Sequence, residues 1–337
     1  MTKKYFLFVF LVLLVMILIN GIGRRSDAYV LGDIVQDDKL NTPALRTRLI
    51  ADFEQGKAPA EIYDNLKIML ADSPSQIFHP AAHAFGELLF TYVDLEGIGV
   101  CDASLAYGCF HSFFAQAIAT KGIDVVSQLD AACNRQFEMQ DDSGCAHGIG
   151  HGLGEYFGPQ GIIQQLEICK TLSRKKLLFG CSDGVFMEYH FPTIAESGSF
   201  MTERLPIEKG NEYLPCAQIG DLYRHACYMS LPSWWRDLLA QDAYAMAALC
   251  EGIEGGLDRE YCFLGIGYAM APTMSHDIPT LKGYCGRLAA PLDLYCVVGA
   301  SAGLAEDVPG GDSIGALCEG LGERIPACVE KSDMLSI

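Results

Sequence analysis

Two stretches of the chain repeat a set of residues that can bind a metal ion. The segments FHPAAHAFGE and AHGIGHGLGE agree at their polar positions, which aligns His79 with His147, His83 with His151 and Glu87 with Glu155. In a helix, residues four apart lie on one face, one turn from each other. Two imidazoles at this spacing can converge on one ion, and a carboxylate one turn further can be a third ligand or can hold a ligand in place. The sequence therefore predicts metal binding by two helices with the pattern His-x-x-x-His-x-x-x-Glu.

Further candidates appear when the later segments are aligned on their second cysteine. Two positions after it stand, in chain order, His111, His147, Asp183, Met229, Leu264 and Val298. The first three can bind a metal ion, and the last three cannot or do so only weakly. The predicted metal ligands are therefore His79, His83, Glu87, His111, His147, His151, Glu155, Asp183 and His190, of which His190 ends the segment that contains Asp183. His225 and His276 lie outside the pattern and are expected to be structural or surface residues.

Three interpretations of these histidines stay open. They hold a divalent transition metal, or they form a polar seam that keeps neighbouring helices in register, or they perform acid–base or ligand chemistry without a metal. Nitrogen and carboxylate donors suit zinc, iron, manganese or copper. In a metalloenzyme the ion would polarise a substrate or activate water, with Glu87 or Glu155 as the catalytic general base. Because the sequence holds no nucleophile elbow, phosphate loop or dinucleotide fingerprint, it does not decide between an enzyme and a binding protein.

The 14 cysteines form seven short-range pairs with none left over. Their spacing is never C-x-x-C, which argues against zinc ribbons, thioredoxin-like motifs and c-type haem attachment. We predict seven disulfides: Cys101 with Cys109, Cys133 with Cys145, Cys169 with Cys181, Cys216 with Cys227, Cys250 with Cys262, Cys285 with Cys296, and Cys318 with Cys328. Disulfides persist in oxidising compartments, so we expect the body of the protein outside the cytoplasm.

The N-terminus is consistent with export. Lysines at positions 3 and 4 precede an apolar run over residues 5–22, which arginines at positions 24 and 25 close. Its length is at the border between a signal peptide and a membrane-spanning helix. We expect residues 1–25 to be a transmembrane signal anchor, with the rest of the chain facing the periplasm or the extracellular space. If the signal is cleaved near Ser26 and Ala28, the protein is secreted instead.

The spacing of the cysteines predicts a repeat protein. The first members of the pairs recur at intervals of 32, 36, 47, 34, 35 and 33 residues, which is the period of helical hairpins. Each unit reads as helix, loop, helix, with one cysteine ending the first helix and the other starting the second. We therefore expect an all-α array of disulfide-stapled helical hairpins over residues 43–337, after a polar linker at 26–42. The array forms an open α-solenoid or a closed α/α toroid, with the candidate site in residues 75–190.

Two local features of this array leave alternatives open. The second helix of one unit carries Gly148, Gly150, Gly152 and Gly154. Each glycine weakens the helix, and the alternating pattern indicates either close packing of neighbouring helices or close approach of a ligand. The long interval between Cys181 and Cys216 predicts a loop that flanks the groove of the array and could cap it or bind a partner.

Composition restricts the partners. The chain has 24 Lys and Arg against 42 Asp and Glu, a net charge of −18, and half of its residues are apolar. Such a charge repels nucleic acid, and the apolar content excludes intrinsic disorder. The expected partner is the membrane, through the N-terminal helix. In the alternative class of function the repeats form a scaffold that binds a protein or glycan, for which Trp234 and Trp235 are either contacts or core residues.

Three resemblances accompany these patterns. The helical hairpins with an internal cysteine pair resemble the disulfide-stapled Sel1-like repeat proteins exported by bacteria, which implies the same kind of architecture. The paired His and carboxylate motifs on successive repeats are similar in logic to those of HEAT-repeat di-iron hydroxylases. The segments GCFHSF, CAHGIGHGLGE and CSDGVFMEY, within about residues 75–190, look like a set of exported bacterial cysteine- and histidine-rich helical-repeat proteins. That last resemblance implies no activity.

Overall fold

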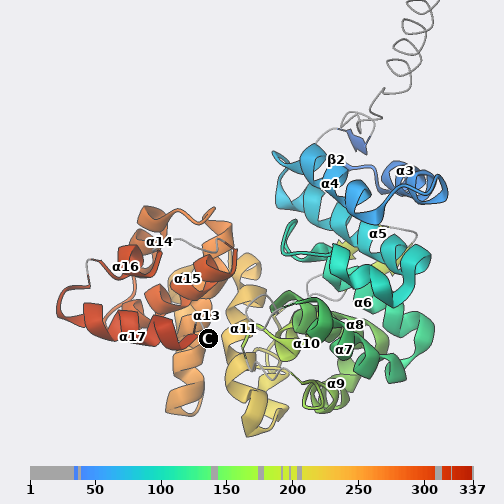
Figure 1. Ribbon diagram of the computed structural model, residues 1–337. Helices are drawn as coiled ribbons and strands as arrows, with labels where there is room; N and C mark the ends of the chain where they lie inside the picture. Colours follow the sequence, from blue (N-terminus) through green and yellow to red (C-terminus); the bar gives the residue numbers. More distant parts are fainter. Residues whose placement is uncertain are drawn as a thin grey trace, which may run out of the picture.

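The structure is a computed structural model, and it describes residues 34–36, 39–137, 143–173, 178–190, 193–196, 199–202, 207–307, 313–319 and 321–335. These residues are mainly helical, as the sequence predicts (Figure 1). The predicted anchor at residues 1–25 lies outside the described residues. Among the residues that are described, no helix is both long enough and apolar enough to cross a membrane.

Most of the chain is built around a row of helices in which each packs against the next. In chain order these row helices are α5 (Ser75–Val93), α6 (Gly108–Lys121), α8 (Ser143–Phe157), α10 (Cys181–His190), α11 (Asp221–Leu238), α13 (Gly256–Thr273), α15 (Leu292–Asp307) and α17 (Ile325–Leu335). The row is an open arc, with its N-terminal and C-terminal ends well apart (Figure 1). The open alternative, the α-solenoid, therefore agrees with the structure better than the closed toroid does.

Shorter helices flank the row and complete the hairpins. They are α7 (Val126–Gln136), α9 (Ile162–Cys169), α12 (Ala243–Glu251), α14 (Ile278–Cys285) and α16 (Ser313–Cys318), with 3-10 turns at Asp94–Val100, Ile123–Val125, Pro159–Gly161, Cys216–Gln218 and Gly322–Arg324. Asp242 and Asp277 begin α12 and α14, because each side chain accepts hydrogen bonds from the free amides of the first turn. At the N-terminal end, α3 (Thr42–Glu54) and α4 (Pro59–Leu70) form the helical pair expected there.

All seven predicted disulfides are confirmed. In the unit that α9 and α10 form, Cys169 is the last residue of the first helix and Cys181 is the first residue of the second. Each disulfide thus closes the short loop between a flanking segment and a row helix. In α11 and α13 the second cysteine, Cys227 or Cys262, lies inside the helix and not at its first residue as the sequence predicts. The disulfide therefore links the first turns of a row helix to the flanking segment, which matters most for the glycine-rich α8.

Two small sheets differ from the sequence predictions. In the linker, β1 (Val35–Gln36) pairs antiparallel with β2 (Lys39–Leu40). In the long interval after α10, where we expect a loop, β3 (Thr193–Glu196) pairs antiparallel with β4 (Ser199–Thr202), and Thr193 lies opposite Thr202. The backbone groups of these strands bond to each other, so the interval contains a hairpin and not only a loop.

The row helices approach each other closely at glycines. A Cβ atom on Gly150 of α8 would lie 2.0 Å from the carbonyl oxygen of Cys181, and one on Gly184 of α10 would lie 2.1 Å from that of His147. A side chain at either position would overlap the neighbouring backbone, so α8 and α10 meet through backbone contact. The packing interpretation of the alternating glycines is therefore supported. The same contact brings the histidines of α8 next to the acidic residues of α10.

Large apolar side chains fill the spaces between the helices. The largest fully buried ones are Trp234, Trp235, Tyr63, Phe85, Phe113, Phe114, Phe186 and Phe263. The two tryptophans thus belong to the core, which agrees with the core alternative and leaves neither ring on the surface for a glycan or protein.

Candidate metal centre

Five histidines gather where three successive row helices meet. His79 and His83 come from α5, His111 from α6, and His147 and His151 from α8. His79 is half-buried and the other four are buried. We call these five residues the histidine cluster. Equivalent positions of neighbouring repeats lie side by side, as the alignment of the repeats predicts.

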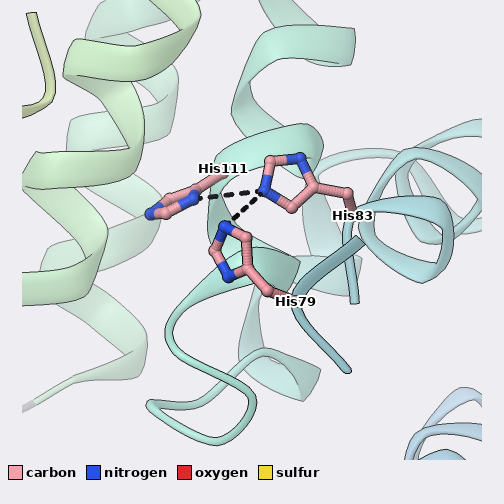
Figure 2. A group of neighbouring side chains, drawn as sticks. All are labelled: His79, His83 and His111. Atoms are coloured by element: carbon pink, nitrogen blue, oxygen red, sulfur yellow. Dashed lines mark hydrogen bonds between the residues drawn. The ribbon is translucent and has the colours of Figure 1, made fainter. Parts of the chain in front are cut away.

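The first three histidines of the cluster form one group of potential ligands. The Nε2 atoms of His79 and His83 are 3.0 Å apart, and Nδ1 of His111 lies 3.4 Å from Nε2 of His83. Figure 2 shows the three rings pointing toward one another from α5 and α6. One nitrogen from each ring falls within 4.8 Å of the others, so this group could hold a metal ion.

The second group repeats the first and shares one residue with it. The Nε2 atoms of His147 and His151 are also 3.0 Å apart. The ring of His111 stacks on that of His151, with 4.0 Å between the ring centres, and the three residues again offer nitrogens within 4.8 Å of one another. His111 therefore belongs to both groups.

The 3.0 Å separation within each pair fits a shared ion. Two imidazole nitrogens bound to one metal at about 2.0–2.1 Å, with an angle of about 90–110° between the bonds, lie about 2.8–3.4 Å apart. Both pairs have this spacing before any ion is present. Little rearrangement would be needed for each pair to bind one.

The other ring nitrogen of each paired histidine has a partner outside the cluster. Nδ1 of His79 lies 3.3 Å from the Leu105 carbonyl oxygen, Nδ1 of His83 lies 2.8 Å from Ser112 Oγ, Nδ1 of His147 lies 3.2 Å from Asp183 Oδ2, and Nδ1 of His151 lies 2.7 Å from Glu188 Oε1. Metal-binding histidines commonly donate their free N–H to such groups, which fixes the ring and leaves Nε2 for the metal. The contacts of His79 and His151 favour a proton on Nδ1 and a free Nε2 lone pair. Ser112 can donate to Nδ1 of His83 or accept from it, and the contact of His147 with Asp183 lacks hydrogen-bond geometry.

Burial lowers the pKa of the histidines. Loss of hydration lowers the pKa of His79 to about 4, although its contact with Leu105 acts in the opposite direction. Loss of hydration and the neighbouring imidazoles lower the pKa of His83 and His111 well below the usual value. In His151 burial outweighs the hydrogen bond to Glu188, and the pKa is lowered as well. These rings are neutral at pH 7, which is the form that binds a metal.

The metal-free protein is therefore expected to lose stability as the pH falls below about 6.5. A histidine with a pKa near 6.5 in the unfolded chain and a lowered pKa in the folded one gains its proton on unfolding between these two values. For His79, whose folded pKa is about 4, the loss of unfolding free energy reaches about 3 kcal/mol at pH 4. Urea unfolding in the presence of a chelator at pH 7.5, 6.0 and 4.5 measures this loss.

Protonation of Glu155 has the opposite effect on stability, so a variant of this residue serves as the control for the predicted pH dependence. Loss of hydration, and then the charges of Glu188 and Glu87, raise the pKa of Glu155 to about 8, so its protonation stabilises the folded protein as the pH falls. In the variant Glu155→Gln this opposing contribution is gone, and the fall in stability should be steeper than in the wild type. A urea midpoint that stays constant from pH 7.5 to 4.5 in Glu155→Gln would contradict the prediction.

The carboxylates of the two sequence motifs lie away from the paired Nε2 atoms. Glu87 is held by two short contacts to Arg46 of α3, at 2.6 and 2.7 Å. Glu155 is exposed. Neither belongs to the two groups of potential ligands found among the described residues. Their roles as ligand or general base stay predictions.

The two predicted ligands of α10 differ from each other. Asp183 contacts the ring of His147, so it lies at the edge of the cluster without facing the paired Nε2 atoms. His190 is fully buried, its Nε2 lies 3.0 Å from the Leu214 carbonyl oxygen, and its ring stacks on Trp234. His225 contacts Asp258, which agrees with the structural role expected for it.

Three groups at the site were not predicted from the sequence. They are Glu188, Ser112 and the backbone carbonyl of Leu105. In the alignment on the second cysteine, Met187 corresponds to His151, so Glu188 is offset by one position from the aligned row. A search that allowed neighbouring positions would have found Glu188, but no sequence signal points to the other two.

The comparisons with known proteins assign no family. No protein-family model matches the chain, and neither the curated proteins nor the solved structures give a significant match. The structure itself shows a helical protein of seven disulfide-bonded helix pairs, with buried histidines that could hold a metal.

Proposed function

We propose that this protein binds a divalent transition metal through its histidine cluster, in an oxidising compartment outside the cytoplasm. The observation that carries the proposal is the environment of His147 and His151. The Nδ1 atoms of both face carboxylates, at 3.2 and 2.7 Å, while their Nε2 atoms face each other at 3.0 Å. Protons on both Nδ1 atoms leave two Nε2 lone pairs directed at each other, and a bound cation removes this repulsion.

The pair in α5, His79 and His83, does not distinguish metal binding from a polar seam without metal. Ser112 can donate its hydroxyl proton to Nδ1 of His83, which then carries its own proton on Nε2 and donates it to Nε2 of His79. A polar seam without metal satisfies that pair completely. In the α8 pair, a hydrogen bond from Nε2 of His147 to Nε2 of His151 would leave Nδ1 of His147 unprotonated at 3.2 Å from the Asp183 carboxylate, which is unfavourable. The metal interpretation is thus favoured by one pair and compatible with the other.

The donor set favours zinc or copper. Imidazole nitrogens suit these ions, whereas manganese prefers sites rich in carboxylate and water oxygens. The cysteines are all in disulfides and supply no thiolate. The seven disulfides support an oxidising compartment outside the cytoplasm, where the N-terminal segment would anchor the protein to the membrane with the repeats outside.

Elemental analysis by mass spectrometry tests the proposal. Protein with intact disulfides and no affinity-tag histidines is challenged separately with zinc, copper, iron and manganese, and then desalted. We expect the wild type to retain zinc or copper, and the double variant His147→Ala/His151→Ala to lose most of it. The folding of this variant is checked by circular dichroism and by its full set of disulfides.

A variant outside the cluster controls for weak binding elsewhere. His276 is half-buried and has a positive φ of 58°, a conformation that asparagine tolerates. His276→Asn should therefore fold normally and retain as much metal as the wild type. If the wild type stays metal-free after challenge with all four ions, the proposal is wrong and the histidines form a polar seam.

A further inference from the structure

His111 occupies a special position in the cluster, between the two pairs. Its ring centre lies 5.2 and 5.3 Å from those of His79 and His83 on one side, and 5.2 and 4.0 Å from those of His147 and His151 on the other. The side chain is buried, at 4% exposure. It is the residue common to both groups of potential ligands.

The two nitrogens of His111 point in opposite directions. Nδ1 faces His83, and Figure 2 shows the other ring nitrogen on the far side, away from His79 and His83. That atom, Nε2, is buried and has no hydrogen-bond partner among the described residues. Leaving a buried polar nitrogen unpaired costs about 1–3 kcal/mol, so the fold maintains it against a penalty. A ligand of Nε2 would remove that penalty.

Among the described residues, His111 is the third potential ligand of each pair of histidines. A metal site with catalytic or exchangeable character commonly has three protein ligands and an open position. One ion would use three histidines and leave the other pair without a third ligand. Two ions can each have three histidine ligands from this cluster only if His111 binds both, one through each nitrogen.

We propose that the histidine cluster holds two metal ions and that His111 bridges them, with Nδ1 bound to the ion of His79 and His83 and Nε2 bound to the ion of His147 and His151. This inference rests on the proposed function and specifies its stoichiometry and its bridge. A neutral imidazole has one lone pair available, so the bridging ring gives up its remaining N–H proton, which leaves to solvent as the second ion binds. The resulting anion also offsets part of the charge that two dications bring into a buried site.

Copper provides a probe of the bridge that does not depend on any activity. The full chain is loaded with Cu²⁺ and desalted, its copper is counted by mass spectrometry, and its unpaired spins are counted by low-temperature electron paramagnetic resonance. Two copper ions joined through an imidazolate couple their spins. We expect two copper ions per chain and a spin count well below one per copper.

The variant His111→Phe removes both bridging nitrogens and retains a flat ring in the buried space. We expect the copper that this variant still binds to show one full spin per ion, and its copper content to fall because each pair has lost its third ligand. His276→Asn, which leaves the cluster intact, should keep both the stoichiometry and the low spin count of the wild type.

The outcomes separate this inference from the proposed function. One copper per chain, or two copper ions with one full spin each, would overturn the bridge and leave metal binding by the cluster in place. If the wild type retains no copper or other metal, the proposed function fails and the bridge fails with it. Because the wild type alone decides these cases, a variant that does not fold does not obscure the result.

Discussion

Reduction of the seven disulfides is expected to unfold the protein at neutral pH. Each disulfide joins residues 8 to 12 positions apart. On the chain-entropy account, a closed loop of this length stabilises a fold by about 2.5–3 kcal/mol, so seven independent loops contribute about 19 kcal/mol. Native domains are commonly stable by only about 5–15 kcal/mol. The oxidised fold should therefore not survive complete reduction.

The row helices explain why the staples matter so much here. The helix α8 contains Gly144, Gly148, Gly150, Gly152 and Gly154, and each glycine costs about 1 kcal/mol relative to alanine in a helix. The glycines cannot simply be replaced, because Cβ atoms at several of them would overlap neighbouring atoms. The fold thus combines weak helices that pack closely with covalent links that limit the unfolded chain.

Circular dichroism and urea unfolding of reduced and oxidised protein, both metal-free, measure the effect. We expect the reduced protein to lack a cooperative transition at 25 °C. The variant Cys318→Ser/Cys328→Ser removes only the staple at the C-terminal end of the row and should lower the stability without abolishing the transition, since neighbouring repeats fold as a linear array. A reduced protein with the urea midpoint of the oxidised one would contradict this account.

The covalent pattern of the fold was predictable from the sequence because it is local. Cysteines such as Cys250 and Cys262 are near in the chain and recur at the period of a helical hairpin, so pairing within each hairpin follows from proximity. The helices follow from the same period. The hairpin of β3 and β4 was not predictable in this way, because it lies in the one long interval, which has no counterpart in the other repeats.

The convergence of the histidines was also predictable, whereas the surroundings of the motif carboxylate were not. Residues i and i+4 differ by only about 40° around a helix axis, which lets His79 and His83 converge. At i+8, Glu87 lies about 12 Å further along the axis than His79 and about 80° around it. Glu87 therefore lies further from the two imidazoles than they lie from each other, and in the structure its oxygens contact Arg46. Its role as a ligand stays a prediction.

Replacing Glu188 by glutamine is expected to weaken metal binding by about 10- to 100-fold. Glu188 Oε1 lies 2.7 Å from Nδ1 of His151, and both side chains are buried. The carboxylate holds the proton on Nδ1, orients the ring and makes Nε2 a stronger donor, and loss of such a partner commonly costs this much affinity. Competition titrations of zinc or copper against a chelator of known affinity, at pH 7.5, measure the change.

Glu87→Gln is the matched control for this prediction. Glu87 is the carboxylate that the sequence motif places beside the histidines, but in the structure its oxygens contact Arg46. Its replacement should lower stability by up to about 1 kcal/mol through loss of a partly exposed ion pair, and should leave metal affinity nearly unchanged. The opposite result, with weak binding in Glu87→Gln and normal binding in Glu188→Gln, would show that the motif carboxylate is the ligand. Because both substitutions exchange a carboxylate for an amide of the same shape, the comparison isolates the position of the charge: metal affinity should follow the carboxylate that α10 presents to the neighbouring α8.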